Sequence, residues 1–113
     1  ELLYEEWLRC FGAVCEEIHI QQTSRTSSAH WPFTEKYNAM GDIEVEHIIE
    51  ALRWSHEHCT ELRWSRYLKP VEKNILILEY LPSTTETEAE IIQNIGESAR
   101  YLRRYIPKGG ILL

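Results

Sequence analysis

The side chains best suited to hold a metal ion are His56, His58 and Cys59, which lie within four residues of one another. Zinc sites usually need four such ligands in a tetrahedral arrangement. If this segment is helical, His58 points about 100° away from Cys59, whereas His56 shares its face. The sequence contains no CxxC or HxxxH pair to complete the set. We therefore predict a partly buried Cys59 beside two surface histidines and no cofactor, with a metal site as the open alternative.

A cysteine nucleophile is a second possibility, because Cys15 precedes His19 by four residues. A nucleophilic thiol needs a nearby base, and His19 is the only one close in sequence. Cys15 also lies on a predicted apolar helix stripe, where a cysteine usually acts as a small hydrophobic residue. We therefore place it in the core. No catalytic group of residues is complete in the sequence, although dispersed ones such as His30, His47 and Glu79 could meet in the fold.

A hydroxyl-rich stretch at 83–85 follows a predicted strand and precedes a predicted helix. Open α/β sheets often bind phosphate at such a junction. This stretch has no glycine that would let the backbone approach a phosphate, and the glutamates around it would repel the anion. Ser83 with Glu86, or Thr85 with Glu88, fits the S/T-x-x-E capping box instead. We therefore predict a helix start here.

The stretch from Asp42 to Pro107 resembles part of a protein-kinase-like fold, with a helix, two strands and a second helix. The run from Ile75 to Pro82 is similar to the hinge of that family. This resemblance implies a fragment of a kinase-like or nucleotide-binding fold. The sequence departs from the family because it lacks the glycine-rich loop, the strand lysine, the HRD-type catalytic loop and the DFG motif. Such a fragment could not phosphorylate a substrate with these residues.

Basic and aromatic side chains alternate between positions 53 and 73, as they do in modules that stack on bases and pair with phosphates. A nucleic-acid-binding module that uses this stretch together with the arginines of the C-terminal part is therefore one alternative function. The net charge of −6 opposes it, and the first fifty residues hold ten acidic side chains against three basic ones. Nucleic acid is thus the less favoured partner.

Protein interfaces are rich in Trp, Tyr and Arg, and four tryptophans are more than a core of this size readily buries. We therefore predict a non-catalytic protein-protein interaction or assembly domain, whose partner is another protein or a second copy of the chain. The predicted partner-binding residues are Trp31, Phe33, Tyr37, Trp54, Trp64, Arg66, Arg100, Arg103 and Arg104.

Three segments show the apolar period of an amphipathic helix. The first runs from Leu2 to about Gln21, and the second covers roughly 43–60, with Asp42 as its expected N-cap. The third follows Pro82 and ends before Pro107, with an apolar stripe that includes Ile91, Ile92, Ile95, Ala99 and Leu102. Between the first two lies a long loop at 22–41, whose aromatic residues are expected to contact the core or a partner.

Strand signals occur at 62–69 and 75–81, and we expect these two segments to form a hairpin. Residues 75–78 are four consecutive branched aliphatics, which predicts burial on both faces of a sheet. The expected fold is therefore α+β, with three helices packed on a small sheet that has a buried central strand at about 75–81.

The length of 113 residues suits a single domain over 1–113, and the start without Met suggests a segment excised from a longer chain. Three cysteines are too few for a disulfide framework, which favours a reducing compartment. The apolar runs are much shorter than the ~20 residues of a membrane span, and no signal-peptide pattern is present. We therefore expect an intracellular protein, cytoplasmic or nuclear, that is not bound to a membrane.

Overall fold

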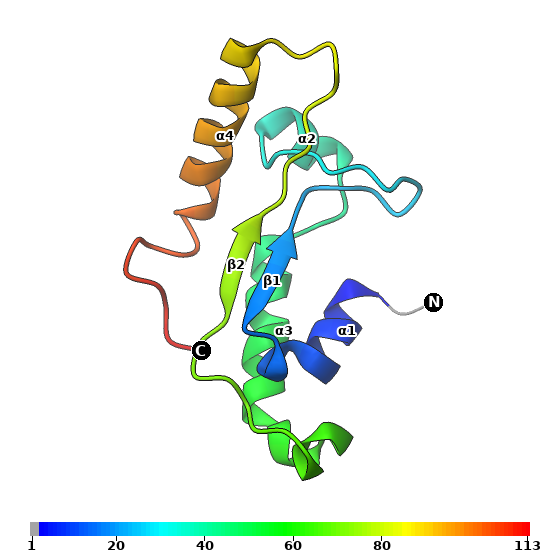
Figure 1. Ribbon diagram of the computed structural model, residues 1–113, viewed down its shortest axis with the longest axis vertical. Coiled ribbons are helices and arrows are strands. Elements are labelled where there is room, and N and C mark those ends of the chain that lie inside the picture. The colour runs from blue at the N-terminus through cyan, green and yellow to red at the C-terminus, as the bar shows by residue number, and fades with distance from the viewer. Residues whose placement is uncertain (1–2) are drawn as a thin grey trace. The chain divides into compact units, whose positions relative to one another are not determined.

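A computed structural model describes residues 3–113, and these adopt an α+β fold, as predicted (Figure 1). Leu2, where the first predicted helix begins, lies outside the described residues. Three short 3-10 turns, at Gly12–Val14, Cys59–Glu61 and Arg63–Arg66, connect the regular elements. Within the described residues these elements are α1 (Tyr4–Phe11), β1 (Glu17–Ile20), α2 (Glu35–Met40), α3 (Val45–Glu57), β2 (Ile75–Leu78) and α4 (Glu88–Leu102).

The chain is divided into two compact units. Unit 1 comprises residues 3–18, 44–76 and 113, and unit 2 comprises residues 19–43 and 77–112. β1 and β2 are neighbours in one two-stranded parallel sheet, in which Ile75 N donates to Glu16 O and Glu79 N donates to Ile20 O. The boundary between the units therefore crosses both strands.

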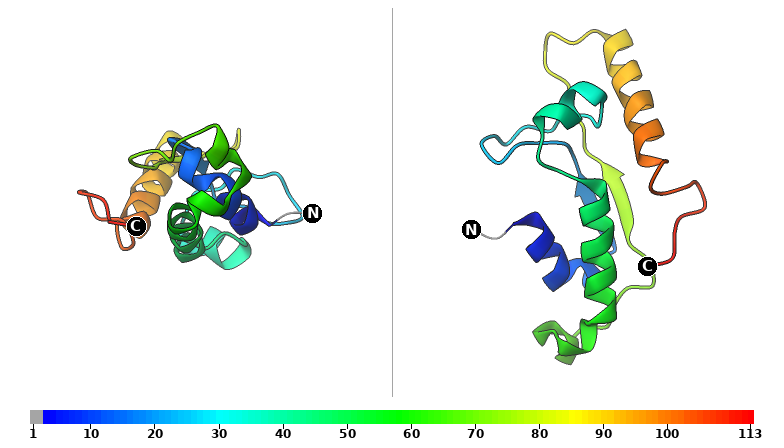
Figure 2. Two further views of the ribbon diagram at one scale, coloured as in Figure 1. Left: turned by 90° about the horizontal axis from the view of Figure 1, so that it is seen from below. Right: turned by 180° about the vertical axis from the view of Figure 1, so that it is seen from behind.

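Unit 1 is built on the contact of α1 with α3 (Figures 1 and 2). Gly12 allows this approach, because a Cβ there would lie only 2.6 Å from the Leu52 side chain. The backbone N–H of Ala13 donates to the buried Ser55 hydroxyl at 2.9 Å. The glycine at the C-terminal cap of α1 is thus used for close packing.

The first predicted helix is wrong in its second half, because α1 ends at Phe11 and Glu17–Ile20 forms a strand. The local spacing fits a helix in one place and a strand in another, because Cys15 and Ile18 are three residues apart and Ile18 and Ile20 are two apart. Asn74 decides between them, since its side-chain amide donates to Gly12 O at 2.8 Å and to Cys15 O at 2.7 Å. A contact from 59 residues away along the chain thus holds Cys15 in an extended conformation.

The predicted hairpin of 62–69 with 75–81 is also wrong. Residues 63–66 form a 3-10 turn, and β2 pairs with β1 in a parallel arrangement. A sheet of two strands has no central strand, and Ile75 is 39% exposed while the rest of β2 is half-buried. The aliphatic run therefore forms the predicted strand but not the predicted buried centre.

Unit 2 contains the segment predicted as a long loop, and part of that segment is ordered as α2. The Thr34 hydroxyl caps this helix by accepting from Tyr37 N at 3.3 Å. Before it, Gln22 and Trp31 form an antiparallel bridge through two backbone hydrogen bonds. The expectation that aromatic residues of 22–41 contact the core is met by Phe33, which is fully buried.

The N-termini of the two longer helices differ from the expected caps. α3 begins at Val45, and the Asp42 carboxylate accepts instead from Arg25 N at 2.7 Å. α4 begins at Glu88, and its capping box is formed by Thr87 and Glu90 rather than by the predicted pairs. Thr87 N donates to Glu90 Oε2, and Glu90 N donates to the Thr87 hydroxyl. Of the two glutamates that were predicted to cap α4, Glu86 lies before the helix and accepts from Ser83 N at 2.6 Å, and Glu88 is the first residue of the helix.

Candidate interaction surface

The face of α4 that points to solvent carries apolar residues. Ile92 is 64% exposed and Ile95 is 47% exposed, and Ala99 is exposed one turn further along. The half-buried Leu102 continues the spacing of three, four and three residues. This is the seam spacing of helices that pair with other helices. We call Ile92, Ile95, Ala99 and Leu102 the α4 seam.

The opposite face of α4 is fixed in unit 2 by polar contacts. Ser98 is fully buried, and its hydroxyl accepts from Phe33 N at 2.9 Å while it donates to Asn94 O. Tyr101 stacks on the Phe33 ring with 5.8 Å between the ring centroids. These contacts determine the rotation of the helix and thereby direct the α4 seam outward.

The N-terminal half of α4 is held by a small hydrogen-bond network. Tyr80 donates to Glu86 Oε1 at 2.6 Å, and the Asn94 amide donates to the same oxygen at 3.0 Å. The hydrogen bond from Tyr80 is the main cause that lowers the pKa of Glu86. Burial is the main cause that raises the pKa of Tyr80. Both pKa shifts keep the Tyr80 phenol neutral and donating to an ionised Glu86 carboxylate. The network thereby joins the loop after β2 to α4.

The three predicted partner-binding aromatics of unit 2 have different environments. Phe33 is 0% exposed and offers no surface to a partner. Trp31 and Tyr37 are half-buried and stack on each other, with ring centroids 5.4 Å apart. By contrast, Arg100, Arg103 and Arg104 are all exposed at the C-terminal end of α4.

The remaining predicted partner-binding residues lie in unit 1. Trp54 is partly exposed and stacks on His58, and the indole N–H of Trp64 donates to Cys10 O. Arg66 is exposed in the 3-10 turn. Unit 1 also exposes Leu3, Trp7 and Phe11 on α1, of which Trp7 and Phe11 are in ring contact. Of the apolar residues of α1, Leu8 is the one that is buried.

The two histidines of the alternative metal site are used in other contacts. His56 Nε2 is 2.8 Å from Asn74 Oδ1, and His58 Nδ1 is 2.9 Å from Trp54 O. Cys59 is half-buried, as predicted. Across residues 3–113, no three His, Cys, Asp or Glu side chains are arranged to hold a metal ion.

Two of the dispersed histidines do meet Glu79 in unit 2. His19 Nδ1 is 3.6 Å and His30 Nε2 is 4.0 Å from the same oxygen, Oε2 of Glu79. All three side chains are partly exposed, and the distances are those of loose ion pairs.

Burial raises the pKa of the Cys15 thiol, which is the opposite of the activation that a nucleophile needs.

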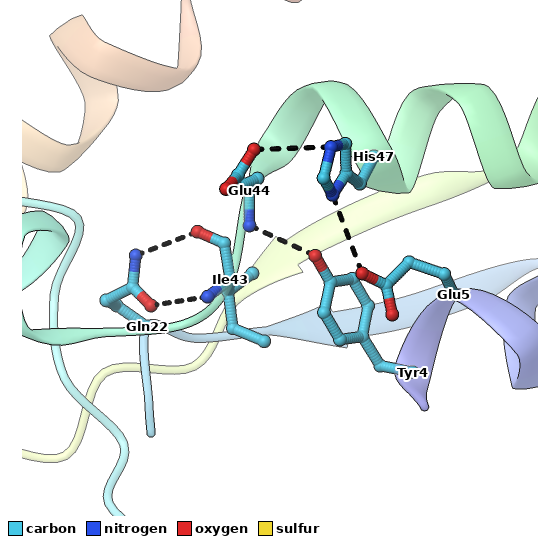
Figure 3. Close-up of polar contacts among 6 residues, drawn as sticks. All are labelled: Tyr4, Glu5, Gln22, Ile43, Glu44 and His47. Carbon is cyan, nitrogen blue, oxygen red and sulfur yellow. Dashed lines mark hydrogen bonds and ion pairs between the residues drawn. The ribbon is translucent and has the colours of Figure 1, made fainter. Parts of the chain in front are cut away.

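A second polar cluster occupies the N-terminal end of α3 in unit 1 (Figure 3). His47 lies between two carboxylates, with Nδ1 3.5 Å from Glu5 Oε1 and Nε2 3.3 Å from Glu44 Oε2. The phenol oxygen of Tyr4 accepts from Glu44 N at 3.1 Å. Both imidazole nitrogens of His47 thus face carboxylates and neither faces a nucleophile, so this cluster is not a catalytic triad.

Tyr4 gives unit 1 a specific alkaline sensitivity. Burial is the main cause that raises the pKa of Tyr4 to about 12, and the charge of Glu5 adds to it. A folded pKa above the unfolded value of about 10 contributes stability that is complete below pH 10 and is lost as the pH rises through about 12. We expect urea unfolding to show this loss in the wild-type chain and a smaller loss in Tyr4→Phe. Tyr67→Phe, at an 85% exposed position, is the control and should follow the wild type. Equal losses in all three would refute the assignment to Tyr4.

Comparison of the sequence with models of protein families and with curated proteins, and of the structure with solved structures, finds no match. No helix among the described residues is both long and apolar enough to cross a membrane.

Proposed function

We propose that the chain is a non-catalytic protein interaction or assembly domain, and that the α4 seam is its binding surface. The observation that carries this proposal is the exposure of two isoleucines on a helix whose rotation is fixed by buried polar contacts. A soluble helix normally turns such residues to its own core. α4 turns Ser98 and Asn94 there instead, which leaves its branched aliphatics for a partner.

The expected energy gain from covering this seam supports specific binding. Full burial of one isoleucine side chain stabilises a complex by about 1.5–3 kcal/mol. Ile92 and Ile95 are one turn apart, so one amphipathic partner helix could cover both. The exposed Arg100 and Arg103 lie beside the seam, in the position of the charged rim that typically surrounds an apolar interface centre.

The nucleic-acid alternative receives less support from the arrangement of its residues. The basic stretch 53–73 belongs mainly to unit 1, whereas Arg100, Arg103 and Arg104 belong to unit 2. The α4 seam itself is apolar, and stacking on bases requires aromatic rings. The interaction function therefore accounts for the exposed face of α4, and the nucleic-acid function does not.

Site-specific photo-cross-linking in the native cells tests the proposal. A benzophenone amino acid replaces Gln93, which is exposed and follows Ile92 in the sequence, or Ser28, which is exposed in the loop of unit 2 and serves as the control. We expect discrete adducts from position 93 only, and we expect Ile95→Asp to abolish them because it places a charge in the apolar contact. Adducts that are insensitive to Ile95→Asp, or none at position 93, would contradict the proposal.

A further inference from the structure

Along the exposed face of α4, the order of residue types read from the N-terminus complements the order read from the C-terminus. At 100° per residue, six positions fall within one face about 100° wide. In chain order they are an acid, two large aliphatics, two small residues and a base: Glu88, Ile92, Ile95, Gly96, Ala99 and Arg103. Five of the six are exposed, and Gly96 is half-buried.

We infer that the partner of the α4 seam is a second copy of this chain, with the two α4 helices antiparallel about a two-fold axis between Ile95 and Gly96. This inference rests on the proposed function of the seam. In this register Glu88 lies level with the partner's Arg103, Ile92 with the partner's Ala99 and Ile95 with the partner's Gly96. Every level then joins an acid to a base or a large side chain to a small one.

A parallel pair would bring each residue level with itself. Glu88 would face Glu88, Arg103 would face Arg103, and both large aliphatics would meet at the same levels while the small residues left gaps. Like charges at close range are unfavourable. Charge complementarity and side-chain size therefore select the antiparallel arrangement over the parallel one, and they select a second copy because the pattern is matched by its own reverse.

Gly96 supports the inference independently. A Cβ at Gly96 would meet only the end of the flexible Arg100 side chain, at 3.4 Å, so nothing within the chain requires a glycine there. A glycine inside a helix costs about 1 kcal/mol relative to alanine. In the antiparallel pair it forms the notch that receives the partner's Ile95. Gly12 shows the contrasting case, since its notch is filled by Leu52 of the same unit.

The charged ends of the seam remain available for these pairs. Arg103 uses one guanidinium nitrogen to donate to Ile106 O at 3.2 Å, which leaves its other N–H groups for a carboxylate. Glu88 lies in the first turn of α4. The backbone N–H of Thr87 donates to Glu90 and not to Glu88. Glu88 and Arg103 of one chain are about 22 Å apart along the helix axis, so they cannot pair within it.

Sedimentation equilibrium of the whole chain tests the inference. A helix pair of this length lies at the small end of specific interfaces, so we expect a reversible dimer between about 10 and 500 μM. A Cβ at position 96 meets only the end of the Arg100 side chain. Gly96→Leu fills the notch and is expected to weaken dimerisation at least ~10-fold. Circular dichroism should show that its helix content is unchanged. A monomer over the whole concentration range, or a dimer unaffected by Gly96→Leu, would overturn the inference.

A charge swap separates the two orientations. Glu88→Arg alone and Arg103→Glu alone should each weaken the dimer, and the double variant should restore it, because the antiparallel pair then regains both opposite-charge contacts. Absence of rescue would overturn the antiparallel arrangement. A chain that sediments as a monomer but still gives the position 93 adduct with another protein would overturn self-pairing alone. Loss of both the dimer and the adduct would overturn the proposed function as well.

Discussion

Gly41→Ala is expected to lower the free energy of unfolding by about 3 kcal/mol. An added Cβ at position 41 would lie 2.0 Å from Gln22 Oε1 and 2.3 Å from Gln22 Cδ. Contacts under 3.0 Å force the neighbour to move, and Gln22 is 1% exposed, in an interior that is normally close-packed. The backbone of Gly41 has φ −94° and ψ 169°, which alanine adopts without strain, so the effect is steric alone.

The damage is large because Gln22 connects several segments of unit 2. Its amide nitrogen donates to Asn38 Oδ1 at 3.0 Å. The same nitrogen donates to Ile43 O at 3.0 Å, and Oε1 accepts from Ile43 N at 2.9 Å (Figure 3). Displacing the amide leaves these buried groups without partners, which costs about 1–3 kcal/mol per group.

Urea unfolding measures the effect of Gly41→Ala. Gly109→Ala is the matched control, because a Cβ at Gly109 meets no atom within 4 Å. The control should remain within about 0.5 kcal/mol of the wild type. Similar stabilities for Gly41→Ala and Gly109→Ala would show that Gln22 moves freely and would contradict the packing described for unit 2.

Phe33→Ala is expected to lower the free energy of unfolding by about 4 kcal/mol. The Phe33 side chain is fully buried and stacks on Tyr101 of α4. Its removal leaves a cavity and also withdraws the ring beside the Ser98 contact that fixes α4. Phe33→Leu, which keeps most of the volume, should lose much less stability.

Thermal and urea unfolding of Phe33→Ala can be compared with Tyr67→Ala, an aromatic truncation at an 85% exposed position. The Tyr67 variant should change stability by about 0.5 kcal/mol or less. If Phe33→Ala were equally mild, Phe33 would be a surface residue, as the sequence alone suggests, and the core of unit 2 would be misassigned.

The sequence was sufficient for the elements whose pattern is long and periodic. α3 and α4 are close to the predicted helices, and the aliphatic run at 75–78 is a strand. The pairing of that strand was not predictable, because the spacing from Cys15 to Ile18 suits a helix whereas the spacing from Ile18 to Ile20 suits a strand. A distant side chain, Asn74, holds the carbonyls of Gly12 and Cys15 in place. Local periodicity contains no information about such a contact.

The candidate surface was predictable only in part. The stripe of Ile91, Ile92, Ile95 and Ala99 was recognised, but periodicity assigns it to the core by default. In the structure the buried side of α4 is held by the Ser98 hydroxyl, which accepts from Phe33 N, and by the Asn94 side chain, which donates to Glu86. A polar residue, Ser98, satisfies a buried backbone N–H, and Ile92, Ile95 and Ala99 of the apolar stripe are exposed. The aromatic residues were predicted to bind a partner because of their type alone. The buried Phe33 and the half-buried Trp31 were therefore predicted together with the exposed arginines.

The two units alternate along the chain, and each strand of the sheet passes from unit 1 to unit 2 part-way along its length. Neither unit is a continuous stretch of sequence. A truncation that removes residues 1–43 would take away α1 together with Gln22 and Phe33, and would damage both units at once. Deletion mapping of a binding activity would therefore trace it to either end of the chain regardless of where the partner binds. Point substitutions such as Ile95→Asp and Gly96→Leu locate it where truncations cannot.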